Sequence, residues 1–162
     1  MLILQLMNLK NTAKNLQKIY YWQMVPAVIL LIMAYLLTFI FHLSDENLTA
    51  GKSVTVIVTT LSGITGIAFP ILYRSYFVHK IRNKKKIKEE TFLNYERTQI
   101  TLALLTPYFL IIAVLMNMNQ TALMLITLFS LYVAYYYFPS EKKVLFEMKI
   151  FRIKPVKPKE PS

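Results

Sequence analysis

Side chains that could do acid–base, nucleophilic or metal chemistry are scarce in this sequence of 162 residues. There are two histidines, eight aspartates and glutamates in total, and no cysteine. The missing cysteine excludes disulfides, thiolate nucleophiles and cysteine metal sites. All eight carboxylates lie outside the long uncharged stretches of the chain: Asp45, Glu46, Glu89, Glu90, Glu96, Glu141, Glu147 and Glu160.

The histidines and serines lack the partners that catalysis requires. We expect His42 and His79, at the ends of two different uncharged stretches, on opposite faces of the molecule. Zinc needs three or four converging ligands, so two separated histidines cannot form its site. Ser62 and Ser130 have no base in their uncharged stretches, and no G-x-S-x-G, H-E-x-x-H or phosphate-binding loop occurs. We therefore predict that the chain is not an enzyme and has no metal site and no cofactor.

A basic segment near the middle of the chain is the most conspicuous candidate for binding. It contains Lys80, Arg82, Lys84, Lys85, Lys86 and Lys88. Such a segment can bind nucleic acid, anionic lipid or an acidic protein. It lacks interleaved aromatic residues and a recognisable nucleic-acid-binding fold, so we predict no nucleic-acid contact. Anionic phospholipids and an acidic partner protein both remain as its predicted contacts.

Three uncharged runs, 19–44, 53–73 and 98–140, determine the predicted fold. Hydrophobic residues make up 56% of the chain, and the mean hydropathy is +0.43. A helix needs roughly 20 apolar residues to cross a bilayer, so the third run holds two crossings and a turn at 116–121. We predict an all-α integral membrane protein with four transmembrane helices, at about 22–43, 53–77, 98–117 and 121–138. Short loops would make them two antiparallel hairpins.

Lysine and arginine predict the orientation of these helices. Seventeen of the 19 basic residues lie in the N-terminal segment, in the loop 79–97 and in the tail, with Lys52 alone on the other side. Because basic loops stay in the cytoplasm, both termini and this loop should be cytoplasmic. The layout and the Lys/Ile/Asn-rich composition resemble small four-helix inner-membrane proteins of bacteria. That resemblance suggests the bacterial inner membrane as the location.

The predicted transmembrane domain, 19–140, is flanked by two further segments. Residues 1–18 carry an apolar stripe, which predicts an amphipathic helix lying in the membrane interface or a helix that docks on a partner. Residues 141–162 form a basic cytoplasmic tail, in which 144–153 fits a short helix or a strand. Arg74 should reach the headgroups, and no ion pair is expected for it because no carboxylate lies within the spans.

Small residues and prolines in the spans predict how the helices pack. Thr59 with Gly63, and Ser62 with Gly66, are pairs of small residues four apart that let two helices approach closely. This face could pack inside the bundle, or it could bind a partner helix or a second copy. Pro70 and Pro107 should kink their helices.

These observations lead to two functional hypotheses. The first is a non-catalytic subunit or assembly factor of a larger membrane complex, with the lipid bilayer and a membrane protein or a second copy as partners. The alternative is a small oligomeric channel or transporter, in which lines of Thr and Ser would face a pore.

Overall fold

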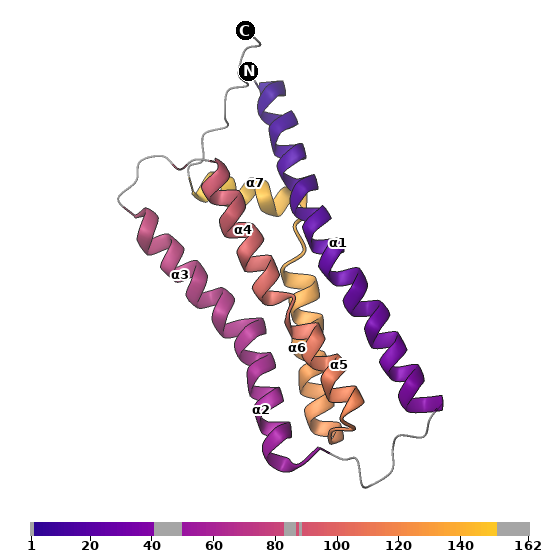
Figure 1. The fold of residues 1–162 in the computed structure, drawn as a ribbon. Helices are drawn as coiled ribbons and strands as arrows, with labels where there is room; N and C mark the ends of the chain where they lie inside the picture. The colour runs from indigo at the N-terminus through magenta and orange to yellow at the C-terminus, as the bar shows by residue number, and fades with distance from the viewer. Residues whose placement is uncertain (1, 41–49, 83–86, 88, 152–162) are drawn as a thin grey trace.

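The computed structural model describes residues 2–40, 50–82, 87 and 89–151, with side chains from residue 11 onward, and this part of the chain is helical with no strand. The elements are α1 (Leu2–Ile40), α2 (Lys52–Gly63), the π-helix η2 (Ile64–Ala68), α3 (Phe69–Ile81), α4 (Glu89–Ala103), α5 (Thr106–Leu115), α6 (Gln120–Tyr136) and α7 (Glu141–Ile150). They form an elongated bundle in which α7 lies crosswise at one end (Figure 1). We call this end, where α3 finishes and α4 begins, the α7 end. The predicted all-α fold is confirmed.

Three helical stretches are long and apolar enough to cross a membrane: Asn11–Ile40, Lys52–Ile81 and Glu89–Leu115. The fourth predicted span corresponds to α6, which has 17 residues. It joins α7 at a bend of 76°, so the described chain has three candidate spans, or four if this bent pair is one span.

Helix α1 differs from the predicted arrangement because it runs for 39 residues without a break. The segment 1–18, predicted as a separate interfacial helix, therefore continues into the first span with no turn between them (Figure 1). No glycine or proline precedes Pro26, so nothing in the sequence interrupts the helix. From Asn11 onward, the buried residues Ala13, Leu16 and Tyr20 belong to the core at the α7 end, and the stripe packs on this chain itself.

Proline disturbs two of the long helical stretches, as predicted. The five-residue π-helix η2 comes immediately before Phe69 and Pro70. The Thr65 hydroxyl donates to the carbonyl oxygens of Leu61 and Ser62 there, at 2.9 and 3.2 Å. Pro107 follows the break between α4 and α5. Proline lacks an N–H and crowds the preceding turn, which explains both irregularities.

Asparagine and serine side chains mark the two tight connections of the second half. The α5–α6 turn contains Asn117, whose φ of 45° is in the left-handed region that asparagine tolerates. Asn119 then caps α6 by accepting a hydrogen bond from the Ala122 N–H at 2.9 Å. Ser140 caps α7 by accepting from the Lys143 N–H. This cap and the helix Glu141–Ile150 show that the ambiguous tail segment is helical up to Ile150.

Close packing in the middle of the bundle depends on Gly66. A Cβ atom at this position would lie 2.8 Å from Thr106 Oγ1 and 3.2 Å from Val133 Cγ2. These residues belong to α5 and α6, so Gly66 is the point where η2 meets both helices. The Thr65 and Thr106 hydroxyls are 3.3 Å apart beside it. Glycine is needed here for its lack of a side chain.

Replacing Gly66 tests this close approach. We expect Gly66→Ala to destabilise the bundle by about 1–3 kcal/mol, the usual cost of overpacking a core. Thermal unfolding of the purified protein in detergent measures the change. Gly51→Ala is the matched control, because a Cβ there meets nothing within 4 Å. Thr106→Ala should recover part of the loss in the double variant, and equal unfolding temperatures for Gly66→Ala and Gly51→Ala would contradict the contact.

Candidate functional site

The structure places the predicted small-residue face inside the bundle. Ser62 and Gly66 are buried, and Gly63 lies against the ring of Phe129 on α6, where a Cβ atom on the glycine would come within 3.3 Å of that ring. The Thr59 hydroxyl is also buried, without a hydrogen-bond partner among the described residues. This face is thus occupied by α5 and α6 of the same chain and is not open to a partner helix.

The basic segment is described only in part. Lys80 and Arg82 lie exposed at the end of α3, and Lys80 sits over the ring of Tyr76 at 5.9 Å. Lys84, Lys85, Lys86 and Lys88 lie outside the described residues. Lys80 and Arg82 do not line the pocket between α1 and α4, and they are not part of the buried polar cluster described next.

The fold brings together a set of buried polar residues at the α7 end, which the sequence interpretation missed. Arg74 of α3 lies 3.8 Å from Glu147 of α7, measured from Nη1 to Oε1. The expectation that Arg74 has no ion-pair partner is therefore wrong. Glu147 belongs to the segment predicted as a basic tail, and the 76° bend between α6 and α7 returns it to the bundle, where it is 6% exposed.

Glu96 of α4 meets the Glu147 carboxyl group within this cluster. Glu96 is 6% exposed, and its side chain is within hydrogen-bonding reach of Glu147. One oxygen on each carboxyl group, Glu96 Oε1 and Glu147 Oε2, has no partner among the described residues. Two adjacent buried carboxyl groups cannot both ionise cheaply, so the pair is suited to hold a proton.

Burial dominates the ionisation of the groups in this cluster. Desolvation, followed by the hydrogen bond and the charge of Glu147, raises the pKa of Glu96 from 4.5 to about 9. Desolvation also lowers the pKa of Lys143, while the neighbouring carboxylates oppose that change. Glu96 precedes the uncharged run that begins at residue 98, and Lys143 follows the run that ends at residue 140, so both groups lie outside the uncharged runs, at the edge of the apolar region.

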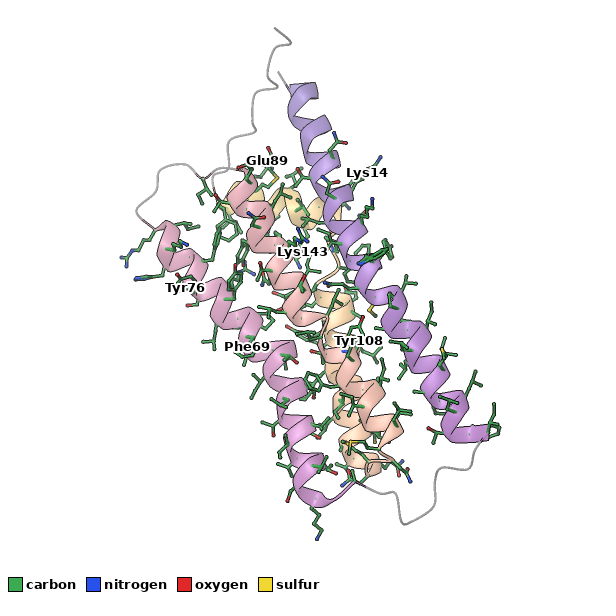
Figure 2. All side chains as sticks on the ribbon, viewed as in Figure 1. Lys14, Phe69, Tyr76, Glu89, Tyr108 and Lys143 are labelled. Carbon is green, nitrogen blue, oxygen red and sulfur yellow. The ribbon has the colours of Figure 1, made fainter. Side chains whose placement is uncertain are left out.

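Lys143 and the aromatic side chains hold α7 in its crosswise position. The ammonium group donates to the carbonyl oxygen of Tyr136 at 2.7 Å and lies over the Tyr136 and Tyr137 rings. Phe77 stacks on Tyr95, with ring centroids 4.0 Å apart, and Phe151 meets Phe77 edge-on at 5.4 Å. Figure 2 shows Lys143 and Glu89 at this same end of the bundle. Glu89 accepts a hydrogen bond from Thr12 of α1 at 2.8 Å.

The short amphipathic patterns contained a signal for this cluster. Glu147 occupies the same stripe as Val144, Met148 and Phe151, all of them buried. Glu96 similarly lies among the buried residues of α4. A carboxylate on the apolar stripe of an amphipathic helix indicates a buried acid, because exposed acids occur on the opposite face.

The arrangement is suited to binding a proton and to fastening α7 to the bundle. No group of three or more histidine or acidic residues in the described part of the chain is placed to hold a metal ion. No nucleophile activated by a neighbouring base is evident among the described residues of the cluster. No protein-family model, curated protein or solved structure matches the chain.

The raised pKa of Glu96 predicts a pH-dependent stability. Between pH 4.5 and about 9 the unfolded chain has released this proton while the folded chain retains it, so stability falls as pH rises through this window. Glu96→Gln should be equivalent to the native chain near pH 4.5. It should gain relative stability with rising pH, by up to about 1.4 kcal/mol per pH unit.

Thermal unfolding in detergent across this pH window measures the difference between the two chains. Glu90→Gln is the matched control, because Glu90 is exposed in the first turn of the same helix. It controls for the loss of a carboxyl group on α4 outside the buried cluster. A parallel pH profile for Glu96→Gln and the native chain would show that Glu96 is ionised in the folded state.

Proposed function

We propose that this chain is an integral protein of the bacterial inner membrane, with both termini in the cytoplasm, and a non-catalytic subunit or assembly factor of a larger membrane complex. Three candidate spans support membrane insertion. The concentration of 17 of the 19 basic residues in the two terminal segments and the middle loop supports the orientation. In this orientation the α7 end faces the cytoplasm.

The sparse packing of α1 is the observation that carries the partner proposal. In the apolar 18-residue window of each candidate span, the share of buried residues is 11% in α1, 33% in Lys52–Ile81 and 44% in Glu89–Leu115. Between Tyr21 and Ile40 its buried side chains are Ala27 and Ala34, each 2% exposed. These two residues are seven apart, as in a narrow helix-packing stripe. Met24 and Leu31 are partly buried against the core, and most other side chains from Tyr21 to Ile40 are exposed.

Large side chains occupy the uncovered surface of α1. Phe39 is 75% exposed and Tyr35 is 67% exposed. Lipid can cover such a surface, but a helix attached to its own bundle along one narrow stripe also leaves ample area for a partner helix. Thr12, Gln23 and Arg74 contact other helices of the same chain, which favours a supporting role over chemistry.

The channel hypothesis receives less support from the hydroxyl groups of the spans. Thr127 and Ser130 of α6 donate to the carbonyl oxygens of Leu123 and Ile126, four residues back in their own helix. Ser62 donates to the Thr59 carbonyl oxygen. Hydroxyl groups satisfied in this way do not need a water-filled pore.

The absence of cysteine allows a direct test of the orientation. Gln120→Cys, at the start of α6, and Lys142→Cys, in α7 beyond the other end of α6, each introduce a single thiol at an exposed position. In intact spheroplasts a membrane-impermeant maleimide should label Gln120→Cys alone, and Lys142→Cys should react only after lysis. The native chain, with no thiol, gives the background. The reverse pattern would refute the cytoplasmic termini, and labelling of both before lysis would refute a membrane crossing by α6.

A photoreactive side chain on α1 tests the partner proposal. Leu36, 50% exposed on α1, is replaced by p-benzoylphenylalanine, and Leu128, 63% exposed on α6, receives the same residue as the matched control. After irradiation of cells at native expression, the α1 position should yield one defined protein adduct, and the same protein should co-purify in stoichiometric amount in mild detergent. Adducts with lipid alone at both positions would contradict a partner on α1, and an adduct with a second copy would indicate a homo-oligomer.

A further inference from the structure

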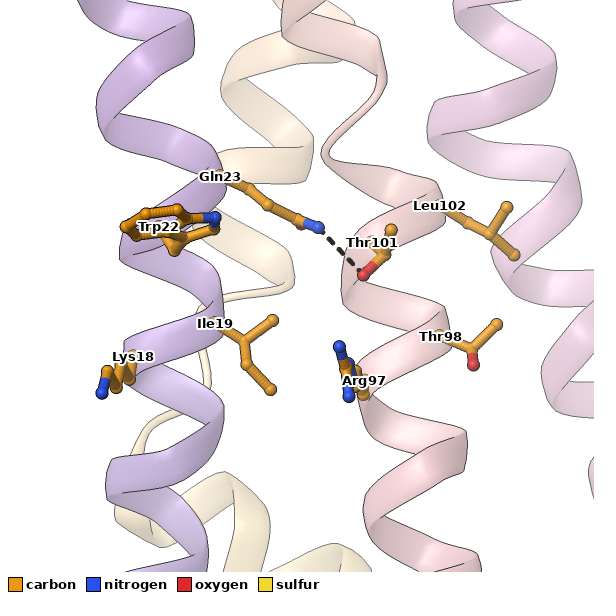
Figure 3. Close-up of a pocket in the computed structure, with 8 residues that line it drawn as sticks. All are labelled: Lys18, Ile19, Trp22, Gln23, Arg97, Thr98, Thr101 and Leu102. Atoms are coloured by element: carbon orange, nitrogen blue, oxygen red, sulfur yellow. Dashed lines mark hydrogen bonds between the residues drawn. The ribbon is translucent and has the colours of Figure 1, made fainter.

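A pocket of about 590 Å³ opens between α1 and α4 (Figure 3). Its lining residues are Lys18, Ile19, Trp22 and Gln23 from α1 and Arg97, Thr98, Thr101 and Leu102 from α4. This volume is within the range of sites for small ligands, about 300–1,000 Å³. The pocket is separate from the buried cluster around Glu96 and Glu147, which faces α3 and α7.

The two cations of the pocket mark its depth in the membrane. Lys18 is the last charged residue before the uncharged run 19–44, and Arg97 is the last before the run 98–140. Both α1 and α4 leave the α7 end in the same direction (Figure 1), so these two residues reach the edge of the apolar layer together. Trp22, 80% exposed, adds the type of ring that prefers headgroup depth.

The polar groups of the pocket are available to an anion. Lys18 and Arg97 are exposed and form no ion pair with any carboxylate in the described part of the chain. Thr101 Oγ1 accepts a hydrogen bond from Gln23 Nε2 at 3.0 Å, which joins the two helices at the pocket. Among the described residues the Thr101 hydroxyl donates to no acceptor, whereas Thr98 donates to the Asn94 carbonyl oxygen. Thr101 therefore retains its proton for a ligand.

The remaining lining residues suit the apolar part of a lipid. Ile19, Leu102 and the Trp22 ring lie beside the cationic groups. A phosphodiester needs cations and O–H or N–H donors, and the glycerol and acyl carbons that follow it need an apolar wall. Basic pockets between helices at the cytoplasmic side of a membrane are suited to anionic headgroups.

We propose that the pocket between α1 and α4 binds the headgroup of an anionic phospholipid, with its phosphate between Lys18 and Arg97 and its acyl chains along the exposed face of α1. This site is distinct from the basic segment 80–88 and does not depend on a protein partner. A soluble phosphate ester shares the headgroup chemistry, but it would leave the apolar wall and the adjacent exposed face of α1 without a function.

Trp22 makes the test direct, because it is the only tryptophan of the chain. The full-length protein is reconstituted in phosphatidylcholine vesicles that contain either phosphatidylglycerol or additional phosphatidylcholine, brominated near the headgroup and at equal fractions. Bromine quenches tryptophan fluorescence on contact. We expect brominated phosphatidylglycerol to quench Trp22 more strongly than brominated phosphatidylcholine.

The double variant Lys18→Gln/Arg97→Gln should weaken this preference roughly 10- to 30-fold in relative binding constant, as expected for the loss of two basic residues at the surface. The control Lys142→Gln/Lys149→Gln removes the same charge from exposed positions on α7 and should retain the preference. Circular dichroism checks that both variants keep their helical content.

Three results would overturn the proposal. Equal quenching by the two brominated lipids would show no headgroup selectivity. An equal loss in both double variants would show diffuse attraction to the surface and no site. Glycerol phosphate that alters Trp22 emission in pure phosphatidylcholine vesicles, and that removes the effect of brominated phosphatidylglycerol, would assign the pocket to a soluble phosphate ester.

Discussion

The cost of placing charge in an apolar layer organises this molecule. An unpaired ion in such surroundings is strongly destabilised, so the charged residues are confined to the segments that flank the uncharged runs. The polar contacts between helices follow the same constraint. Most of them lie towards the α7 end: Thr12 with Glu89, Gln17 with the Pro139 carbonyl, Tyr20 with the Ala134 carbonyl, Gln23 with Thr101, and Arg74 with Glu147.

Deeper in the bundle, close approach of backbones replaces polar contact. Gly66 admits Thr106 and Val133 at distances that a larger residue would not allow. Ala27 and Ala34 perform a similar role where α1 meets the bundle. Lipid is as apolar as a leucine side chain, so burial alone gives little drive for association there, and tight van der Waals packing has to supply it. The bundle is thus fastened by polar contacts at one end and by small residues further along.

The sequence was sufficient for features that depend on neighbouring residues. The uncharged runs predicted the long helices, the 116–121 segment predicted a turn, and Pro70 and Pro107 predicted the irregularities beside them. The failures involve contacts between distant segments. Arg74 and Glu147 are 73 positions apart, and nothing local shows that α7 bends back to join them. The packing of residues 13–20 against this chain also depends on the return of α7 to the bundle. Apolar periodicity shows that such a stripe is buried, but it does not identify the segment that covers it.

Helix α4 connects the buried cluster to the open pocket. Glu96 and Arg97 are adjacent, and consecutive residues of a helix point about 100° apart. The rotation of α4 therefore turns the acid towards α7 and the base towards α1 at nearly the same depth. A helix with the acid outward would separate Glu96 from Glu147 and would place a carboxylate beside Lys18, which would neutralise the pocket. A single rotation of α4 about its axis thus buries Glu96 in the cluster and exposes Arg97 in the pocket. The stack of Phe77 on Tyr95 holds this rotation on one side of α4, and the Gln23–Thr101 hydrogen bond holds it on the other.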